Sequence, residues 1–260
     1  MGRVLRRTLQ SDSEQEYFLY LPRRSATSCR LVISVHGISR NAEEHAVLFA
    51  PFAENYGAIL VAPLFSDTRF HGYQRLFSED PERRADKVLD RIVSEVRGLA
   101  GNCPDKLNLF GYSGGAQFVH RYTMIHPERV AKVVVGAAGW YTFPDSSRSY
   151  PTGIGHNPKM PDIDPDPDRF LRVPAYVIVG ERDLRHDVAL NDSDRLSRYE
   201  GETRMERGRR WIKSMSDAAR AIGLNTDYQF FTVPRSRHSF RQCMKRGGMG
   251  ELTFRLLFGD

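Results

Sequence analysis

The stretch LNLFGYSGGAQFVHRY, from Leu107 to Tyr122, places Gly-Tyr-Ser-Gly-Gly between an apolar run and a helical pattern. Glycine weakens regular structure, so three glycines within five residues need a geometric reason. A sharp turn from strand to helix supplies one, because it pushes the Ser113 hydroxyl away from the sheet and leaves no room for side chains at Gly111 and Gly115. The pattern therefore predicts a nucleophilic serine at residue 113. The alternative is a glycine-rich turn with an incidental serine.

A serine hydroxyl is a weak nucleophile until a base accepts its proton and an acid orients that base. Where such a serine follows a strand of a parallel sheet, the acid and then a histidine follow later strands. Asp183 comes just after the apolar run 175–180, and His238 comes just after the run 228–234. We therefore expect Asp183 to orient His238, and His238 to activate the serine. Three neighbouring residues remain alternatives for the acid, namely Asp187, Asp192 and Asp194.

Acyl transfer also needs hydrogen-bond donors for the negatively charged oxygen that forms at the attacked carbonyl. One donor is typically the N–H of the residue after the nucleophile, and the other lies in the loop after an early strand. Gly114 fits the first position, and Ile38 fits the second because it follows the strand-ending pair His36-Gly37. The sequence thus predicts an oxyanion hole formed by Ile38 and Gly114. We expect His36 to brace this loop, since its place in the chain order does not suit a catalytic base.

Short apolar runs alternate with helical patterns along the chain. The runs are rich in Val, Ile and Phe and end at Gly or Pro, as buried strands do. The expected strands are 17–22, 30–37, 58–63, 106–111, 129–138, 175–180 and 228–234. The expected helices are 43–56, 86–99, 115–126, 206–222 and a last one after residue 238. This order predicts one α/β domain over residues 1–260, with a mostly parallel twisted sheet and helices on both faces.

Two segments interrupt this alternation. Residues 140–174 hold seven of the 14 prolines, so ordinary helix or central strand is not expected there. Long loops in compact domains usually carry function, and we expect a cap-like insertion that packs over the active site. Trp140 and Tyr141 open this segment and are expected to line a substrate pocket, the alternative being core packing. A second insertion is expected at about 184–206.

Together these residues resemble the α/β-hydrolase superfamily of serine hydrolases. The motifs HGISRN, GYSGG, GERD and RHSF stand in the family's order, and the resemblance covers nearly the whole chain. The early His-Gly pair and the chain length are similar to the branch of polyhydroxybutyrate depolymerases and feruloyl-esterase-like enzymes. Two departures concern the substrate class, since Ile38-Ser39 follows Gly37 where lipases continue with glycines, and PRSR replaces the common glycine before the histidine loop. The resemblance implies an α/β-hydrolase fold, an acyl-enzyme intermediate and no cofactor.

The composition sets limits on other functions. With 40% hydrophobic and 27% charged residues the chain is ordinary for a globular protein. The net charge is +6, but the basic cluster 204–213 lies on a helical pattern with its own apolar face. We therefore expect a solvated helix face there and no nucleic-acid partner. No stretch is apolar for long enough to span a membrane, and the aspartates between 162 and 168 lack the glycine and glutamate of a calcium loop, so no structural metal is expected.

The cysteines bear on the cellular compartment. Cys29, Cys103 and Cys243 are few and widely spaced, which indicates neither a disulfide framework nor a metal site. The first residues include basic side chains but no apolar core of a secretory signal. A reducing, cytoplasmic setting is therefore expected.

The sequence as a whole predicts a serine-dependent carboxylic ester hydrolase. Ser113 attacks the carbonyl of a small-molecule or oligomeric ester, His238 transfers the proton, and water releases the acyl group. Two alternatives remain open. One is a serine peptidase or amidase that uses the same groups, and the other is a non-catalytic protein that keeps this fold for binding.

Overall fold

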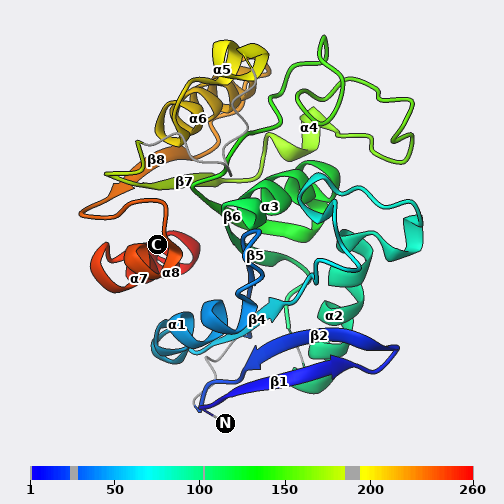
Figure 1. The fold of residues 1–260 in the computed structure, drawn as a ribbon, viewed down its shortest axis with the longest axis vertical. Helices are drawn as coiled ribbons and strands as arrows, with labels where there is room; N and C mark the ends of the chain where they lie inside the picture. Colours follow the sequence, from blue (N-terminus) through cyan, green and yellow to red (C-terminus); the bar gives the residue numbers. More distant parts are fainter. Residues whose placement is uncertain (1, 24–28, 102, 185–193, 260) are drawn as a thin grey trace.

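The computed structural model describes residues 2–23, 29–101, 103–184 and 194–259 (Figure 1). In this part of the chain, eight strands form a sheet with the order β1-β2-β4-β3-β5-β6-β7-β8. Their bounds are β1 (Val4–Leu9), β2 (Asp12–Tyr20), β3 (Arg30–Val35), β4 (Ala58–Pro63), β5 (Leu107–Tyr112), β6 (Val130–Gly136), β7 (Ala175–Gly180) and β8 (Tyr228–Val233). The pairs β1/β2 and β2/β4 are antiparallel, and all other neighbours are parallel. The predicted mostly parallel sheet is confirmed.

The central strands are largely apolar because they are covered on both faces. Every residue of β4, β5 and β7 is buried. A strand with two covered faces has no solvent side on which polar residues could alternate. The edge strand β1 was not predicted, since its sequence VLRRTL reads as polar, and an edge strand tolerates such charges because one side meets solvent.

Helices pack on both faces of the sheet (Figure 1). On one face α1 (Ala42–Asn55) contacts α8 (Met249–Phe258) through the rings of Phe49 and Phe254. On the other face α3 (Gly114–Ile125) lies between α2 and α6, and the His120 ring of α3 contacts Trp211 of α6. The remaining elements are α2 (Ala85–Ala100), α4 (Pro167–Phe170), α5 (Asp194–Glu200), α6 (Arg204–Ala221), α7 (Phe240–Arg246) and the 3₁₀ turns η1 (Tyr73–Arg75), η2 (Pro81–Arg83) and η3 (Pro127–Arg129).

The basic cluster at the start of α6 is only partly the solvated face that the sequence predicted. Arg204 and Arg207 are buried. Arg207 donates a hydrogen bond from Nη1 to the Gly139 carbonyl oxygen at 2.6 Å, so it ties α6 to the start of the proline-rich segment. The exposed basic members and neighbours of the cluster are Arg209, Arg210, Lys213 and Arg220.

The proline-rich segment 140–174 forms most of the long connection between β6 and β7 and includes α4 (Figure 1). Apart from α4 it contains neither helix nor strand, as its prolines lead one to expect. The Tyr150 hydroxyl donates to the Arg75 carbonyl oxygen at 2.8 Å, and the Phe143 ring contacts Tyr199 of α5 at 4.9 Å. These contacts place the segment beside η1 and α5. Its role as a cap stays a prediction.

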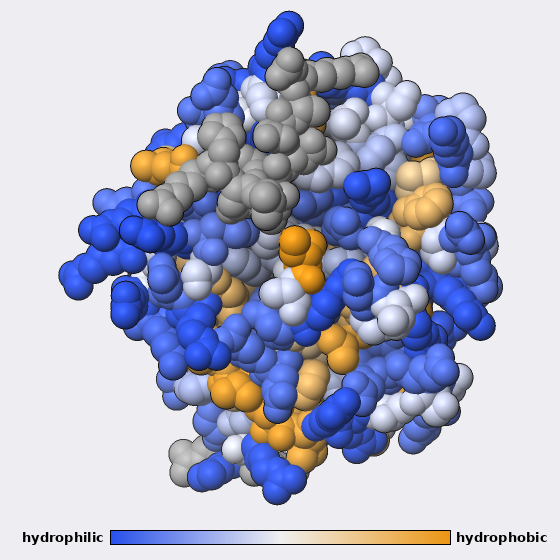
Figure 2. All heavy atoms as spheres, in the orientation of Figure 1, coloured by the Kyte–Doolittle hydropathy of each residue, from blue (hydrophilic) through white to orange (hydrophobic). Residues whose placement is uncertain are grey.

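The surface is mainly hydrophilic on the face drawn in Figure 2, and its apolar groups gather mostly in the lower part of the view. Among the described residues the large apolar side chains that are exposed are Ile38, Val47, Phe77, Leu99, Leu184 and Ile222. None of the helices described is both long and apolar enough to cross a lipid bilayer.

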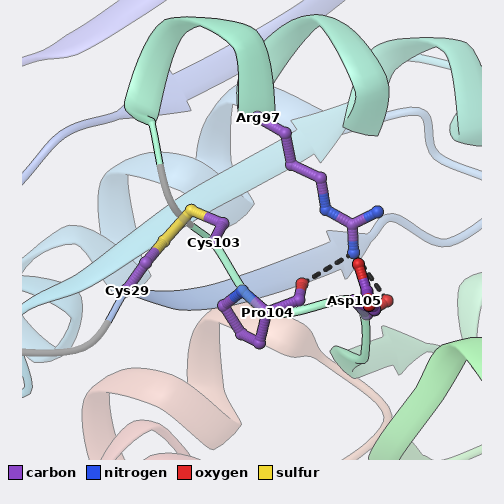
Figure 3. Close-up of a disulfide and its surroundings, with 5 residues drawn as sticks. All are labelled: Cys29, Arg97, Cys103, Pro104 and Asp105. Carbon is purple, nitrogen blue, oxygen red and sulfur yellow. Dashed lines mark hydrogen bonds between the residues drawn. A yellow bond between two sulfur atoms is a disulfide. The ribbon is translucent and has the colours of Figure 1, made fainter.

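Cys29 and Cys103 form a disulfide, which the sequence analysis did not predict (Figure 3). The two cysteines are 74 residues apart in the chain, so their spacing gave no signal. Cys29 directly precedes β3, and Cys103 lies in the loop that enters β5. Because β3 and β5 are neighbouring parallel strands, the segments that enter them start side by side. The disulfide therefore joins the amino-terminal edge of the sheet at its centre.

The surroundings of the disulfide hold the same loop in place (Figure 3). Arg97 of α2 donates from Nη2 to the carbonyl oxygens of Pro104 and Asp105 at 2.8 and 2.6 Å. The third cysteine, Cys243, is a buried free thiol. The prediction that the cysteines form no disulfide is therefore wrong. The cysteines consequently no longer support a reducing compartment.

Candidate active site

Ser113 lies at the turn between β5 and α3. Its backbone has φ 54° and ψ −113°, a region that residues other than glycine rarely adopt. Two hydrogen bonds hold the turn: the Ser113 N–H donates to the Gly136 carbonyl oxygen at 2.7 Å, and the Ser113 carbonyl oxygen accepts from the Gln117 N–H at 3.2 Å. The strained strand-to-helix turn that the GYSGG motif predicts is present.

Glycine is required at positions 111 and 115, because other backbone atoms lie too close to these residues to leave room for a side chain. A Cβ atom on Gly111 would lie 2.1 Å from the carbonyl oxygen of Gly115. A Cβ atom on Gly115 would lie 2.0 Å from the carbonyl oxygen of Val35, in the neighbouring strand β3. Both obstacles are backbone atoms, which cannot rotate away as a side chain can. The turn that projects Ser113 therefore requires glycine at both positions.

The loops after β7 and β8 bring Asp183 and His238 to Ser113. His238 Nε2 lies 3.1 Å from Ser113 Oγ, and His238 Nδ1 lies 2.8 Å from Asp183 Oδ2. A carboxylate at Nδ1 keeps the proton on that nitrogen, so Nε2 presents its lone pair to the serine hydroxyl. The structure thus brings the three predicted residues together. Of the alternative acids, Asp187 and Asp192 fall outside the described residues, as does the side chain of Asp194.

Arg204 contacts this group, and the sequence analysis did not predict it. Its Nη1 lies 3.3 Å from Asp183 Oδ1, and both side chains are almost completely buried. A buried carboxylate is costly unless a charge or hydrogen bonds compensate it, and Arg204 and His238 together occupy both oxygens of Asp183. The only sequence signal was a basic residue near the start of a predicted helix, which is a common pattern on exposed surfaces.

The predicted oxyanion donors are also adjacent. Gly114 is the first residue of α3, where backbone N–H groups have no acceptor within the helix. The place that a Cβ atom on Gly114 would occupy is 3.4 Å from the Ile38 nitrogen. Within the described residues the Ile38 N–H donates no hydrogen bond. The backbone nitrogen of Ile38 thus lies close to Gly114, the residue after Ser113, and such proximity is what two donors to one carbonyl oxygen would need.

His36 fixes the loop that carries Ile38. Its Nε2 accepts from the Phe65 N–H at 3.0 Å, so Nδ1 carries the proton and donates to the Gly37 carbonyl oxygen at 2.7 Å. The Tyr73 hydroxyl donates to the His36 carbonyl oxygen at 2.9 Å. Burial lowers the pKa of His36 to about 4, which keeps the ring neutral. These contacts match the bracing role that the sequence predicted.

Comparisons with known proteins agree with this architecture. No protein-family model matches the sequence, and no curated protein matches it either. Solved structures do match: a poly(3-hydroxybutyrate) depolymerase from Bordetella parapertussis is 23% identical with a TM-score of 0.79, over 99% of this chain and 90% of that one. Poly(aspartic acid) hydrolase-1 from Sphingomonas sp. KT-1 is 23% identical with a TM-score of 0.78, over 94% and 93% of the two chains.

The chain has the α/β-hydrolase fold. A more distant match extends this fold to an S-formylglutathione hydrolase from Agrobacterium tumefaciens, which is 15% identical with a TM-score of 0.59 over 98% of this chain and 95% of that one. In all of these comparisons the identity is low, so they establish the arrangement of strands and helices and not the substrate.

A groove of about 440 Å³ adjoins Ser113 at the carboxyl edge of this α/β-hydrolase fold. Its walls come from the loop after β3 with the start of α1, and from the loop after β8 with the start of α7. The lining residues are Gly37, Ile38, Ser39, Asn41, Glu44, Tyr112, Ser113, His238, Ser239, Phe240 and Arg241. The proline-rich segment contributes none of them. The groove therefore lies on the side of the serine that α1 and α7 border.

Trp140 and Tyr141 are not brought to this groove. The Trp140 ring lies against the Arg121 guanidinium at 4.1 Å and is nearly buried. Tyr141 is completely buried, and its ring stacks on Trp211 at 5.1 Å. Both residues thus occupy the alternative position considered from the sequence, which is packing between the proline-rich segment, α3 and α6. Their positions give no support to a direct contact with substrate.

Glu200, at the end of α5, is a buried acid next to this packing. Its Oε2 accepts from the Tyr141 N–H at 2.9 Å, and burial raises the pKa of Glu200 to about 7. A carboxyl group whose pKa is higher in the folded state destabilises the fold once the unfolded chain ionises. The free energy of unfolding should therefore decrease as the pH rises from about 4.5, the ordinary pKa of glutamate, to about 7. The decrease should be roughly 3 kcal/mol at most.

We expect Glu200→Gln to remove this dependence, because glutamine keeps the acceptor for Tyr141 and does not ionise. The variant should be about as stable as the wild type near pH 5 and more stable near pH 8. Thermal unfolding of both proteins at pH 5 and pH 8 checks this. Glu202→Gln is the control, because Glu202 is exposed. A difference in melting temperature that stays constant with pH would show that Glu200 does not titrate in this range.

Proposed function

We propose that this protein is a serine hydrolase that cleaves carboxylic esters through an acyl-enzyme intermediate. The observation that carries the proposal is the position of His238, whose two nitrogens contact Ser113 Oγ and Asp183 Oδ2. A serine held in a strained turn, with a base at its hydroxyl and a carboxylate behind the base, is the arrangement that activates an alcohol for attack on a carbonyl.

The proposed reaction uses only groups of the chain. Ser113 Oγ attacks the ester carbonyl carbon as His238 Nε2 takes its proton, and the carbonyl oxygen becomes an oxyanion between the N–H groups of Ile38 and Gly114. His238 then gives the proton to the leaving alcohol, and the acyl group stays on Ser113. In the second half of the reaction, water attacks the acyl carbon as His238 Nε2 takes a proton from it. His238 then returns this proton to Ser113 Oγ, and the acid is released. No cofactor enters any of these steps.

The structural neighbours support an ester as the substrate. The depolymerase from Bordetella parapertussis is described as acting on poly(3-hydroxybutyrate), a polyester. By analogy, a small-molecule or oligomeric ester is the proposed substrate of this chain. The analogy rests on fold similarity, so the placement of Ser113, His238 and Asp183 carries the chemistry.

One observation favours a second candidate, an amidase. The equally similar Sphingomonas protein is described as a poly(aspartic acid) hydrolase, and the backbone of that polymer consists of amide bonds. The same three residues would serve, because His238 can protonate a leaving amine as well as an alcohol. The non-catalytic alternative has less support, because the contacts of His238 with Ser113 and Asp183 are those that a catalytic base would need.

A panel of substrates tests the proposal. We expect the protein to hydrolyse aryl esters with acyl chains of graded length and to leave the matching anilides largely intact, because an ester is the more reactive bond. Initial rates of release of the chromogenic leaving group measure both. Faster cleavage of the anilides would favour the amidase, and no cleavage of either set would favour a binding protein.

A further inference from the structure

The groove beside Ser113 lies on the side where the leaving group must stand. His238 Nε2 has to deliver its proton to the leaving oxygen, so that oxygen and the rest of the alcohol lie next to the histidine. The groove is lined by His238 and by the three residues that follow it, and on the opposite wall by the loop that carries Ile38. An ester bound with its carbonyl oxygen at Ile38 and Gly114 would therefore place its alcohol part in this groove.

The groove is polar where the alcohol would lie. An ion pair joins the two walls of the groove, from Nε of Arg241 on α7 to Oε1 of Glu44 on α1. Asn41 donates from Nδ2 to the other glutamate oxygen at 2.7 Å. A plain alkyl alcohol would leave these groups without new partners, whereas a leaving group with its own charge could use them.

The Arg241 side chain has N–H groups that are available to a ligand. Among the described residues its only hydrogen bond is the one from Nε to Glu44, so both terminal Nη groups lack a protein acceptor. Glu44 holds one edge of the planar guanidinium and thereby orients the other edge. Two parallel N–H donors on that edge match the two oxygens of a carboxylate. The site is thus suited to a second carboxylate that comes from outside the protein.

Further arginines lie on the two loops that carry Asp183 and His238, together with the exposed carboxylate of Glu181, which accepts from the Arg235 N–H at 3.1 Å. Three other arginines stand exposed on the neighbouring loops, namely Arg182, Arg235 and Arg237. The loops lie side by side, since the Arg182 N–H donates to the Ser236 carbonyl oxygen at 2.8 Å. Within the described residues none of the three arginines forms an ion pair. The three arginines do not line the groove, but an excess of positive charge on adjacent loops raises the local concentration of anionic ligands.

We propose that Arg241 forms a carboxylate subsite for the leaving group, so that the preferred substrates are esters whose alcohol is itself a hydroxy acid with a free carboxylate. This inference rests on the proposed ester hydrolysis. In the step concerned, the bond between the acyl carbon and the hydroxy acid oxygen breaks, His238 protonates that oxygen, and the hydroxy acid leaves with its carboxylate on Arg241. The subsite directs hydrolysis to the carboxyl end of an oligomer of hydroxy acids.

A matched pair of substrates tests this subsite. The acetyl ester of 3-hydroxybutyrate carries the carboxylate, and the acetyl ester of 3-hydroxybutyramide has nearly the same shape without the charge. We expect kcat/KM of the wild type to be about tenfold higher for the charged ester at low ionic strength, as a partly solvated charge-assisted contact allows. This ratio should fall as salt is added, because salt screens exposed charges.

Variants then assign the preference to Arg241. Arg241→Gln should bring the ratio close to one, and Arg241→Lys should give an intermediate value because it keeps the charge without the planar pair of donors. Arg220→Gln is the control, since Arg220 is similarly exposed and paired with a carboxylate on α6, away from the groove. The control should retain the wild-type ratio.

Each outcome decides one question. If the wild type cleaves both esters at equal rates, or if Arg241→Gln keeps the preference, the subsite is wrong and the ester hydrolase stands. If the wild type cleaves neither ester and no aryl ester, the proposed function itself fails. Should Arg241→Gln not fold, Arg241→Lys decides, because the loss of the planar pair of donors should still lower the ratio, and a wild-type ratio in that variant would overturn the subsite.

Discussion

Ester hydrolysis should fall by roughly 10⁴-fold or more when Ser113 is replaced by alanine, since loss of the nucleophile leaves only substrate binding and the oxyanion donors. The protein should remain folded. Alanine has the same Cβ atom as serine, and both hydrogen bonds that hold residue 113 in its turn involve backbone atoms of that residue. Initial rates on an aryl acetate, together with a thermal melt of each variant, separate lost chemistry from lost structure.

A fluorophosphonate probe makes this test independent of the substrate. The probe reacts with an activated serine, so it should label the wild type at Ser113 and leave Ser113→Ala unlabelled. Ser216→Ala, on α6, serves as the control and should be labelled like the wild type. Equal labelling of Ser113→Ala and the wild type would remove Ser113 from the mechanism.

Removing the disulfide should produce the largest change in stability. Replacing Cys29 and Cys103 together with serine should lower the free energy of unfolding by about 4 kcal/mol, because the bond closes a loop across 74 residues of the chain. Activity at room temperature should persist, since the disulfide lies where β3 and β5 begin and Ser113 lies beyond the end of β5. Urea unfolding of the oxidised protein and of the double variant measures the difference.

Reductant supplies the matched control. It should destabilise the wild type to the level of the double variant and leave the double variant unchanged. A wild type that melts identically with and without reductant would show that the two thiols are not joined. Disulfides are rare in reducing compartments, so a bonded pair would also argue against the cytoplasmic location predicted from the sequence.

The catalytic candidates were predictable because they follow strand ends. Buried parallel strands are recognisable as short apolar runs, and in such a sheet their carboxyl ends share one edge. Ser113, Asp183 and His238 each come directly after a run of this kind, so chain order alone placed them together. The glycines of the GYSGG motif gave a second signal for Ser113, because positions where the backbone passes very close to other backbone atoms require glycine.

The features that were not predicted depend on contacts across the chain. Cys29 and Cys103 meet because the strands that follow them are neighbours, and strand order cannot be read from cysteine spacing. Arg204 looks like any basic residue near a helix start, yet it is buried against Asp183. Trp140 and Tyr141 stand at the expected sheet edge, but which way a side chain turns there depends on the helices packed beside it.

The close backbone contacts at Gly111 and Gly115 have a consequence for directed evolution. A library that varies these two positions would consist mostly of misfolded proteins, because each Cβ atom would overlap a backbone oxygen. Asn41 and Ser239 directly precede α1 and α7, and Arg241 lies in α7, so these three residues border the groove and can change without touching that turn. Randomising these three positions would allow selection for esters of other alcohols, while the turn that carries Ser113 stays unchanged in every variant.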